Sequence, residues 1–233
     1  MLNLYRRKPN TSQVAELLAL RMKLFATQDL EILVKSMNKQ EQGSPPGLFI
    51  VAAAYELMQG NQTEAIAELQ QATQPGYSAW WRLAAWHQLR QLGVQIPEAQ
   101  DKIVRALVLE YPVKDRRVIL AAYADHSARY VDGSGRLFSW DQPDSNAAQL
   151  IDEFMTSGQA ILQHAPLWNK PEPGPPPGSN TRLSILTDAG LHFSQGPAKI
   201  LSKDPLSGKI VQCANTLIAK INSDLNYVPK RLI

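Results

Sequence analysis

The sequence predicts an α+β protein in which N-terminal stacked helical hairpins precede an antiparallel five-stranded sheet with two long helices. Three patterns predict this class. Apolar residues recur at helical spacing before residue 113, strand formers alternate with tight turns over residues 117–140, and helix, two strands and helix follow. We therefore expect a helical-repeat domain over residues 1–112 and an α+β domain over residues 113–233, in the order β-β-β-α-β-β-α.

The composition is ordinary for a globular protein. The chain has 233 residues, of which 44% are hydrophobic and 19% are charged. Its most apolar run, residues 47–57, is about half the length that crosses a bilayer. The N-terminus has no apolar run of signal-peptide length, and the one cysteine, Cys213, allows no internal disulfide. We expect a cytoplasmic protein without membrane insertion.

Basic residues gather near the N-terminus. Residues 1–40 carry seven Lys or Arg and three Asp or Glu, whereas residues 41–113 carry four and seven. No aromatic residues are interleaved with the basic ones, as a surface for single-stranded nucleic acid requires. We interpret Arg6-Arg7-Lys8 as a solvated tail and expect no nucleic-acid partner.

The first half is predicted to be helical throughout. Helical spacing is found over residues 13–25, 30–37, 48–59, 63–73, 79–92 and 97–107. From the fourth segment on, small residues recur at an offset of 34 residues, with Ala65 corresponding to Ala99 and Ala72 to Ala106. Such an offset between small residues indicates stacked helical hairpins.

Over about residues 47–107 the chain resembles the tetratricopeptide repeat family. The residues that carry the resemblance are Gly60, Ala65 and Ala72 in the first unit and Trp80, Leu83 and Ala84 in the second. The sequence departs from the family at the turn of the second unit, where Gly93 is displaced, and over residues 13–38. The resemblance implies a scaffold that binds peptides or partner domains on a concave face. The C-terminal half resembles no family.

Three tryptophans are concentrated in one predicted helix, as Trp80, Trp81 and Trp86. Side chains at neighbouring positions of a helix point about 100° apart, so we expect Trp80 or Trp81 to lie near the surface. Because interface anchors are enriched in tryptophan, these residues are candidates for binding a protein partner. Packing in the core is the alternative.

Residues 117–140 predict a meander of three strands. Loops at Asp125-His126 and at Gly133-Ser134 would pair Tyr123 with Ala128 and Tyr130 with Leu137. Both faces of this meander carry apolar residues, so we expect both to be covered. A slip of one residue would exchange the two faces.

The rest of the second half reads as helix, connector, hairpin and helix. A helix of about 18 residues follows the cap residues 141–145, and Asp204-Pro205 begins the final helix. Between them, the connector 169–180 contains five prolines and two glycines and serves either as a crossover or as a ligand for aromatic grooves. Strands are expected over residues 182–186 and 191–193.

No catalytic or metal motif is present. None of the four histidines, His87, His126, His164 and His192, lies at a metal-ligand spacing, and no dinucleotide or phosphate fingerprint occurs. We therefore expect no catalytic residue, metal or cofactor. If the protein has a polar pocket, we expect it at the tips of the two hairpins and near Trp140, where the meander ends. Its candidate residues are Asp125, His126, Arg129, Trp140, Asp141 and His192.

These patterns predict a non-enzymatic protein–protein interaction module, an adaptor or assembly component whose partner is another protein. This hypothesis predicts an exposed apolar or tryptophan-bearing patch. The alternative is a small-ligand-binding protein or an enzyme with its pocket between the helical repeats and the sheet. It predicts a concave pocket in which polar groups converge and titration is shifted.

Overall fold

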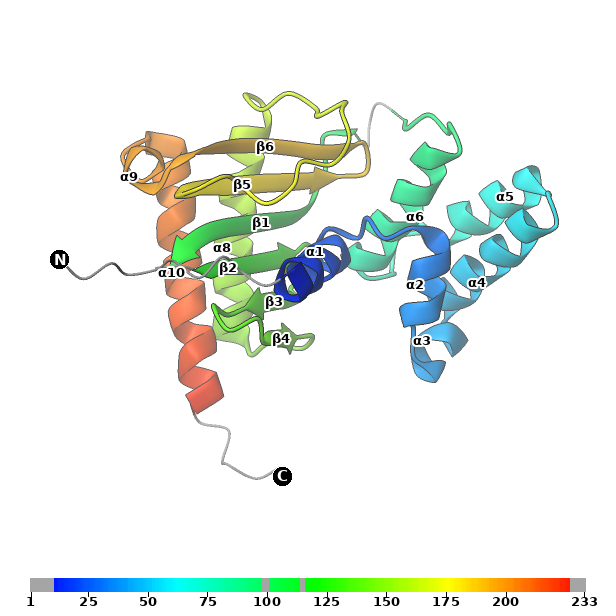
Figure 1. Ribbon diagram of the computed structural model, residues 1–233, viewed down its shortest axis with the longest axis horizontal. Coiled ribbons are helices and arrows are strands. Elements are labelled where there is room, and N and C mark those ends of the chain that lie inside the picture. Colours follow the sequence, from blue (N-terminus) through cyan, green and yellow to red (C-terminus); the bar gives the residue numbers. More distant parts are fainter. Residues whose placement is uncertain (1–10, 98–100, 114–115, 227–233) are drawn as a thin grey trace.

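A computed structural model describes residues 11–97, 101–113 and 116–226, and it confirms the α+β class (Figure 1). The first helices are α1 (Thr11–Phe25), α2 (Leu30–Ser36), α3 (Lys39–Gly43), α4 (Pro45–Met58), α5 (Gln62–Ala72) and α6 (Ala79–Gln91). The strands are β1 (Val104–Val113), β2 (Arg116–Tyr123), β3 (Ala128–Val131), β4 (Leu137–Trp140), β5 (Asn180–Thr187) and β6 (Gly190–Pro197). The later helices are α8 (Ser145–Leu162), α9 (Ala198–Leu201) and α10 (Pro205–Asn226).

The sheet has six strands rather than the predicted five, in the order β4-β3-β2-β1-β5-β6. The additional strand, β1, lies at the centre and pairs antiparallel with both β2 and β5. The prediction of helix over residues 97–107 is wrong from Val104 on, because this segment begins β1. Its continuous apolar run suits a strand that is buried on both faces, and a short apolar run does not distinguish such a strand from a buried helix. The sheet thus begins inside the segment assigned to the helical domain.

The register of the meander is one residue away from the predicted one. Ala122 pairs with Ala128, and Val131 pairs with Leu137. The cause is the first turn, where the backbone N–H of Tyr123 donates to the carbonyl of Ser127 (2.9 Å) and His126 has a φ of 65°. A three-residue loop that ends in a left-handed residue is shorter than the predicted loop. Each residue of β3 consequently lies on the face of the sheet opposite to the predicted one.

Both faces of the sheet are covered, as predicted, and helices cover each of them (Figure 1). One core joins α4, α5 and α6 to the face that carries Ala106, Val108 and Ile119. The other core joins α8 and α10 to the opposite face, which carries Leu107, Leu109 and Leu120. Alternate residues of β1 therefore enter different cores.

The predicted helix starts in the second half are confirmed. Asp144 precedes α8, and its carboxylate accepts the N–H of Ala147 (2.8 Å). Asp204 precedes α10 and accepts the N–H of Ser207 (2.7 Å). These caps satisfy N–H groups that have no partner within the helix, which is why both helices begin there.

The two helices predicted as an N-terminal hairpin pack against different parts of the molecule. Helix α1 lies on the sheet, where the hydroxyl of Tyr123 donates to the carbonyl of Leu24 (2.7 Å) (Figure 1). Helix α2 packs on α4 instead. Within the described ranges, no helix has both the length and the apolar content needed to span a membrane.

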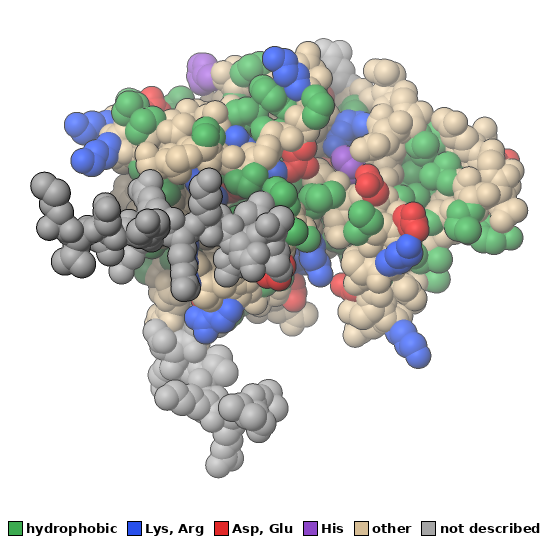
Figure 2. Space-filling view, viewed as in Figure 1, with side chains coloured by type: hydrophobic (Ala, Val, Ile, Leu, Met, Phe, Trp, Pro, Cys, Tyr) green, Lys and Arg blue, Asp and Glu red, His purple; other side chains and the backbone are tan. Residues whose placement is uncertain are grey.

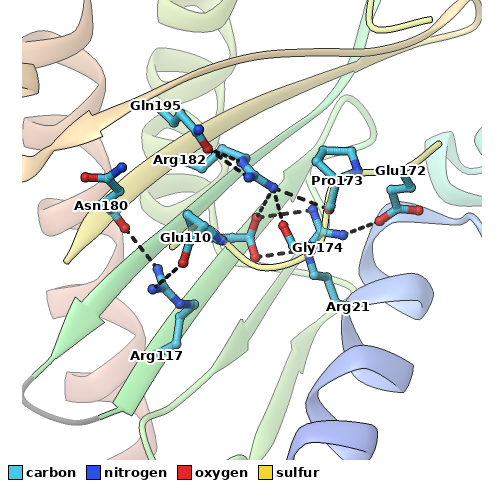
Figure 3. Close-up of polar contacts among 10 residues, drawn as sticks. Arg21, Glu110, Arg117, Glu172, Pro173, Gly174, Asn180, Arg182 and Gln195 are labelled. Carbon is cyan, nitrogen blue, oxygen red and sulfur yellow. Dashed lines mark hydrogen bonds and ion pairs between the residues drawn. The ribbon is translucent and has the colours of Figure 1, made fainter. Parts of the chain in front are cut away.

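Buried ion pairs hold α1 and the connector 169–180 against the sheet (Figure 3). The carboxylate of Glu110 on β1 accepts from Arg21 of α1 at 3.0 Å and lies 4.0 Å from Arg182 of β5. Arg182 also donates to the carbonyl of Gly174 (2.6 Å), and Arg117 donates to that of Pro176 (2.8 Å). The connector is a crossover from α8 to β5 whose carbonyls are bound by arginines.

Candidate functional site

The three candidate tryptophans lie in and around the core between α6 and the sheet. Trp80 and Trp86 are buried, and the indole N–H of Trp80 donates to the carbonyl of Lys23 (2.6 Å). Trp81 is half-buried, and its ring meets that of Trp80 edge-on at a centroid distance of 4.9 Å. The indole of Trp80 therefore ties α6 to α1, and none of the three tryptophans is exposed.

Two of the polar candidates join the helices to the sheet. The carboxylate of Asp125, in the β2–β3 turn, accepts the N–H of Ala79 (2.8 Å) at the start of α6. The guanidinium of Arg129 lies over the rings of Trp80 (5.5 Å) and Tyr123 (5.3 Å). Both side chains thus support the core between the sheet and the N-terminal helices, which we call the helix-side core.

The other polar candidates lie elsewhere, so the six residues do not form one pocket. The ring of His126 contacts Asp152 of α8 (2.9 Å), and Asp141 is exposed. Trp140 lies near Lys220 of α10 (6.0 Å). His192 is on β6, at the opposite edge of the sheet from β4, and its Nδ1 lies 2.9 Å from the carbonyl of Ala165.

An exposed apolar row runs along α4. We call it the α4 seam and define it as Leu48, Val51, Tyr55 and Met58. Leu48 is 53% exposed, Tyr55 60% and Met58 83%, whereas Val51 is half-buried. On the other side of the helix, Ile50 and Ala53 are fully buried. Figure 2 shows hydrophobic side chains at the end of the molecule where α4 lies in Figure 1.

The spacing of the α4 seam is that of helix pairing. Steps of three, four and three residues place all four side chains along one stripe, as at the a and d positions of a coiled coil. The seam was missed from sequence because α4 is apolar all round, and a helix that is apolar on every side is usually buried on every side. The a/d spacing was the signal that could have revealed it.

The hairpin of α4 and α5 carries only negative charge. Between Lys39 and Arg82 the sequence contains Glu41, Glu56, Glu64 and Glu68 and neither Lys nor Arg. The outer face of α5 is polar, with exposed residues such as Glu64 and Gln70. An apolar seam next to an acidic surface favours a partner that is apolar and basic.

A separate cleft of about 310 Å³ lies between the helices and the β5–β6 turn. Its walls combine aromatic and aliphatic side chains with polar ones, among them Phe25, Thr27, Leu83, His87, Arg90, Trp168, Lys170, Glu172, Leu186 and Leu191. Burial, together with the nearby Arg90, lowers the pKa of His87 to about 4, and burial lowers the pKa of Arg90 to about 10. Polar groups with shifted pKa values in a concave site are the features expected of a ligand pocket.

The described residues contain no cluster of three or more His, Cys, Asp or Glu that could hold a metal ion. Comparison of this chain with protein-family models, curated proteins and solved structures finds no match. The α4 seam and the cleft are therefore the two candidate sites in the described part of the chain.

Proposed function

We propose that this protein is an interaction module that binds a helical segment of another protein along the α4 seam. The observation that carries the proposal is the exposure of Leu48, Tyr55 and Met58 on one stripe of α4. Single exposed apolar residues are common on protein surfaces, whereas a continuous row at helix-pairing spacing is typical of a binding surface. Burying these side chains against a partner provides the main driving force.

The partner is expected to be a basic amphipathic helix. A helix that places its own apolar residues between those of the α4 seam reproduces the helix-in-groove mode of recognition. The α4–α5 hairpin contains Glu56, Glu64 and Glu68 and neither Lys nor Arg. Lys or Arg beside the partner's apolar stripe would therefore be attracted to it. The resemblance of this hairpin to a tetratricopeptide unit adds support, since that family binds proteins.

The test compares a seam variant with a matched control of equal charge. Tyr55→Glu with Met58→Glu places two charges in the α4 seam, whereas Gln70→Glu with Gln71→Glu places two on the exposed face of α5. Each protein captures partners from source-cell lysate after cross-linking. A synthetic peptide from the captured partner's helix is then titrated by fluorescence anisotropy. We expect the seam variant to bind this peptide at least about tenfold more weakly and the control to bind it like the wild type.

Two results would contradict the proposal. One is a partner peptide that is acidic or not helical, or that binds the seam variant as tightly as the wild type. The other is a wild-type dimer in light scattering that the seam variant converts to a monomer, because a second copy of this chain would then occupy the α4 seam. Circular dichroism establishes that each variant is folded.

A further inference from the structure

The cleft contains a guanidinium that lacks a carboxylate partner. Arg90 comes from α6, one turn after His87, and its Nη1 donates to the backbone carbonyl of Asp188. No other hydrogen bond from Arg90 to a described residue is present. A neutral carbonyl satisfies one of the five N–H donors of a guanidinium and none of its charge.

The carboxylate of Asp188 is already bound by another arginine. It is fully buried, and it accepts from Nη2 of Arg105 at 2.7 Å and from Nε of Arg105 at 3.0 and 3.2 Å. The charge of Asp188 also acts on the pKa of Arg82 and of Arg90. The carboxylate of Asp188 is therefore paired with Arg105, and the printed contact of Arg90 is with the backbone carbonyl of Asp188.

The remaining charged residues of the cleft do not balance Arg90. Glu172 is the acidic residue among those that line it, and Glu172 pairs with Arg21 of the buried cluster (Figure 3). Lys170 is a further cation, and its ammonium lies 5.5 Å from the centroid of the Trp168 ring. Apart from Glu172, whose charge is paired with that of Arg21, the lining therefore carries two cations, Arg90 and Lys170.

The walls around Arg90 are largely apolar, and the neutral polar residues among them are Thr27, His87, Asn169 and Thr187. Phe25, Leu83 and Leu186 are buried in the helix-side core at this point. The hydroxyl oxygen of Thr27 is buried without a hydrogen-bond partner in the described structure. His87 is neutral at pH 7 because burial holds its pKa near 4. A ligand would thus meet a cation, a free hydroxyl and an uncharged imidazole between apolar surfaces.

We propose that this cleft binds a small organic carboxylate with an aromatic or aliphatic body, whose carboxylate pairs with Arg90. An arginine binds a carboxylate through two parallel N–H donors, and this pairing strengthens in a partly buried site. The apolar body would lie against Phe25, Leu83 and Trp168. The volume of about 310 Å³ is at the lower end of the range for ligand pockets, roughly 300–1,000 Å³, so the ligand is small.

Calorimetric titration with three probes tests this proposal. The probes are 3-phenylpropionate, its uncharged amide and acetate, which separate the contributions of charge and apolar body. We expect 3-phenylpropionate to bind with a Kd of about 1 mM or below, and the amide and acetate to bind at least about tenfold more weakly. Comparing acid with amide on the wild-type protein keeps the test valid even if an Arg90 variant does not fold.

Arg90→Gln is expected to weaken 3-phenylpropionate binding about tenfold or more, because the neutral amide cannot pair with the carboxylate. The matched control is Arg136→Gln, since Arg136 is 73% exposed and pairs with Asp132 in the β3–β4 turn. The control should bind like the wild type. The seam variant Tyr55→Glu with Met58→Glu should also bind like the wild type, because this site is independent of the proposed interaction function.

Three outcomes would overturn the proposal. Equal affinity for acid and amide would mean that Arg90 does not select a carboxylate. Equal affinity for acetate and 3-phenylpropionate would mean a bare anion site without recognition of an apolar body. Absence of heat with 3-phenylpropionate up to about 10 mM, where a Kd of 1 mM would give near-saturation, would mean that the cleft does not bind this class.

Discussion

The two faces of the sheet are covered by helices in different ways. Helices α8 and α10 bury an apolar face, with Ile151, Phe154 and Leu217 in its core. On the other face, α1 and α6 cover an apolar core at one end and the Glu110 cluster beside it (Figure 3). Burial of apolar area attaches the first pair of helices, whereas side-chain hydrogen bonds and ion pairs also position the second pair.

Directional contacts are concentrated on the face that α1 and α6 cover. Apolar contacts are non-directional, so matching volume dominates the packing of α8 and α10, and polar contacts such as that of His126 with Asp152 supplement it. Tyr123, Trp80 and Asp125 each bond to one backbone group of α1 or α6. Both candidate binding surfaces, the α4 seam and the cleft, belong to the part of the molecule on this side of the sheet. The following predictions test the comparison.

The largest effect on stability is expected from removing the charge of Glu110, which lies at the centre of the buried ion pairs. Glu110→Gln preserves shape but leaves Arg21 and Arg182 without the buried charge that faces them. We expect the free energy of unfolding to fall by about 3–5 kcal/mol, as for other buried pairs that lose one partner. Urea denaturation measures it. Glu31→Gln breaks the exposed Glu31–Lys35 pair instead and should leave stability unchanged. Equal effects of the two changes would contradict the comparison.

The next effect concerns pH and His87 on α6. Burial lowers the pKa of His87 to about 4 from its ordinary value of 6.5. Between pH 6.5 and 4 the unfolded chain therefore binds a proton that the folded chain does not, and stability falls as the pH falls. The loss amounts to at most about 3 kcal/mol, since each pKa unit corresponds to about 1.4 kcal/mol. Urea denaturation across this range should show that the stability of His87→Gln depends less steeply on pH than that of the wild type.

A smaller effect is expected at the tether between the β2–β3 turn and α6. Asp125→Ala removes the acceptor of the Ala79 N–H and should destabilise the protein by about 1–2 kcal/mol, as for a helix cap. Thermal unfolding gives the change. Asp125→Asn retains an oxygen acceptor, so it should lose less. Should both variants match the wild type, Asp125 would not attach α6 to the sheet.

The smallest effect is expected on the apolar face. Ile151 is fully buried against the sheet, and Ile151→Val removes one methylene group. The expected loss is about 0.5–1.5 kcal/mol in chemical denaturation. Conservative changes at the two faces would then differ several-fold, with Glu110→Gln the more damaging. A larger loss for Ile151→Val than for Glu110→Gln would show that directional contacts do not dominate the face that α1 and α6 cover.

Features that depend on local chemistry could be predicted from the amino-acid sequence. Asp144 and Asp204 cap their helices through residues three positions away, so the starts of α8 and α10 were readable. The turn between β5 and β6 is equally local, whereas α4 begins at Pro45, before the predicted start at residue 48. The absence of metal-ligand spacing among the histidines was likewise visible along the chain.

The other features depend on residues that lie far apart in the chain, so they became visible only with the fold. Val104–Leu107 form a strand since β2 and β5 flank them, although their apolar run alone also suits a helix. Glu110 pairs with Arg21 from 89 positions away. The cleft exists because α6, the crossover and the β5–β6 turn meet. The α4 seam is a surface because the described residues leave that side of an apolar helix uncovered, and burial of this kind is not encoded in the helix's own sequence.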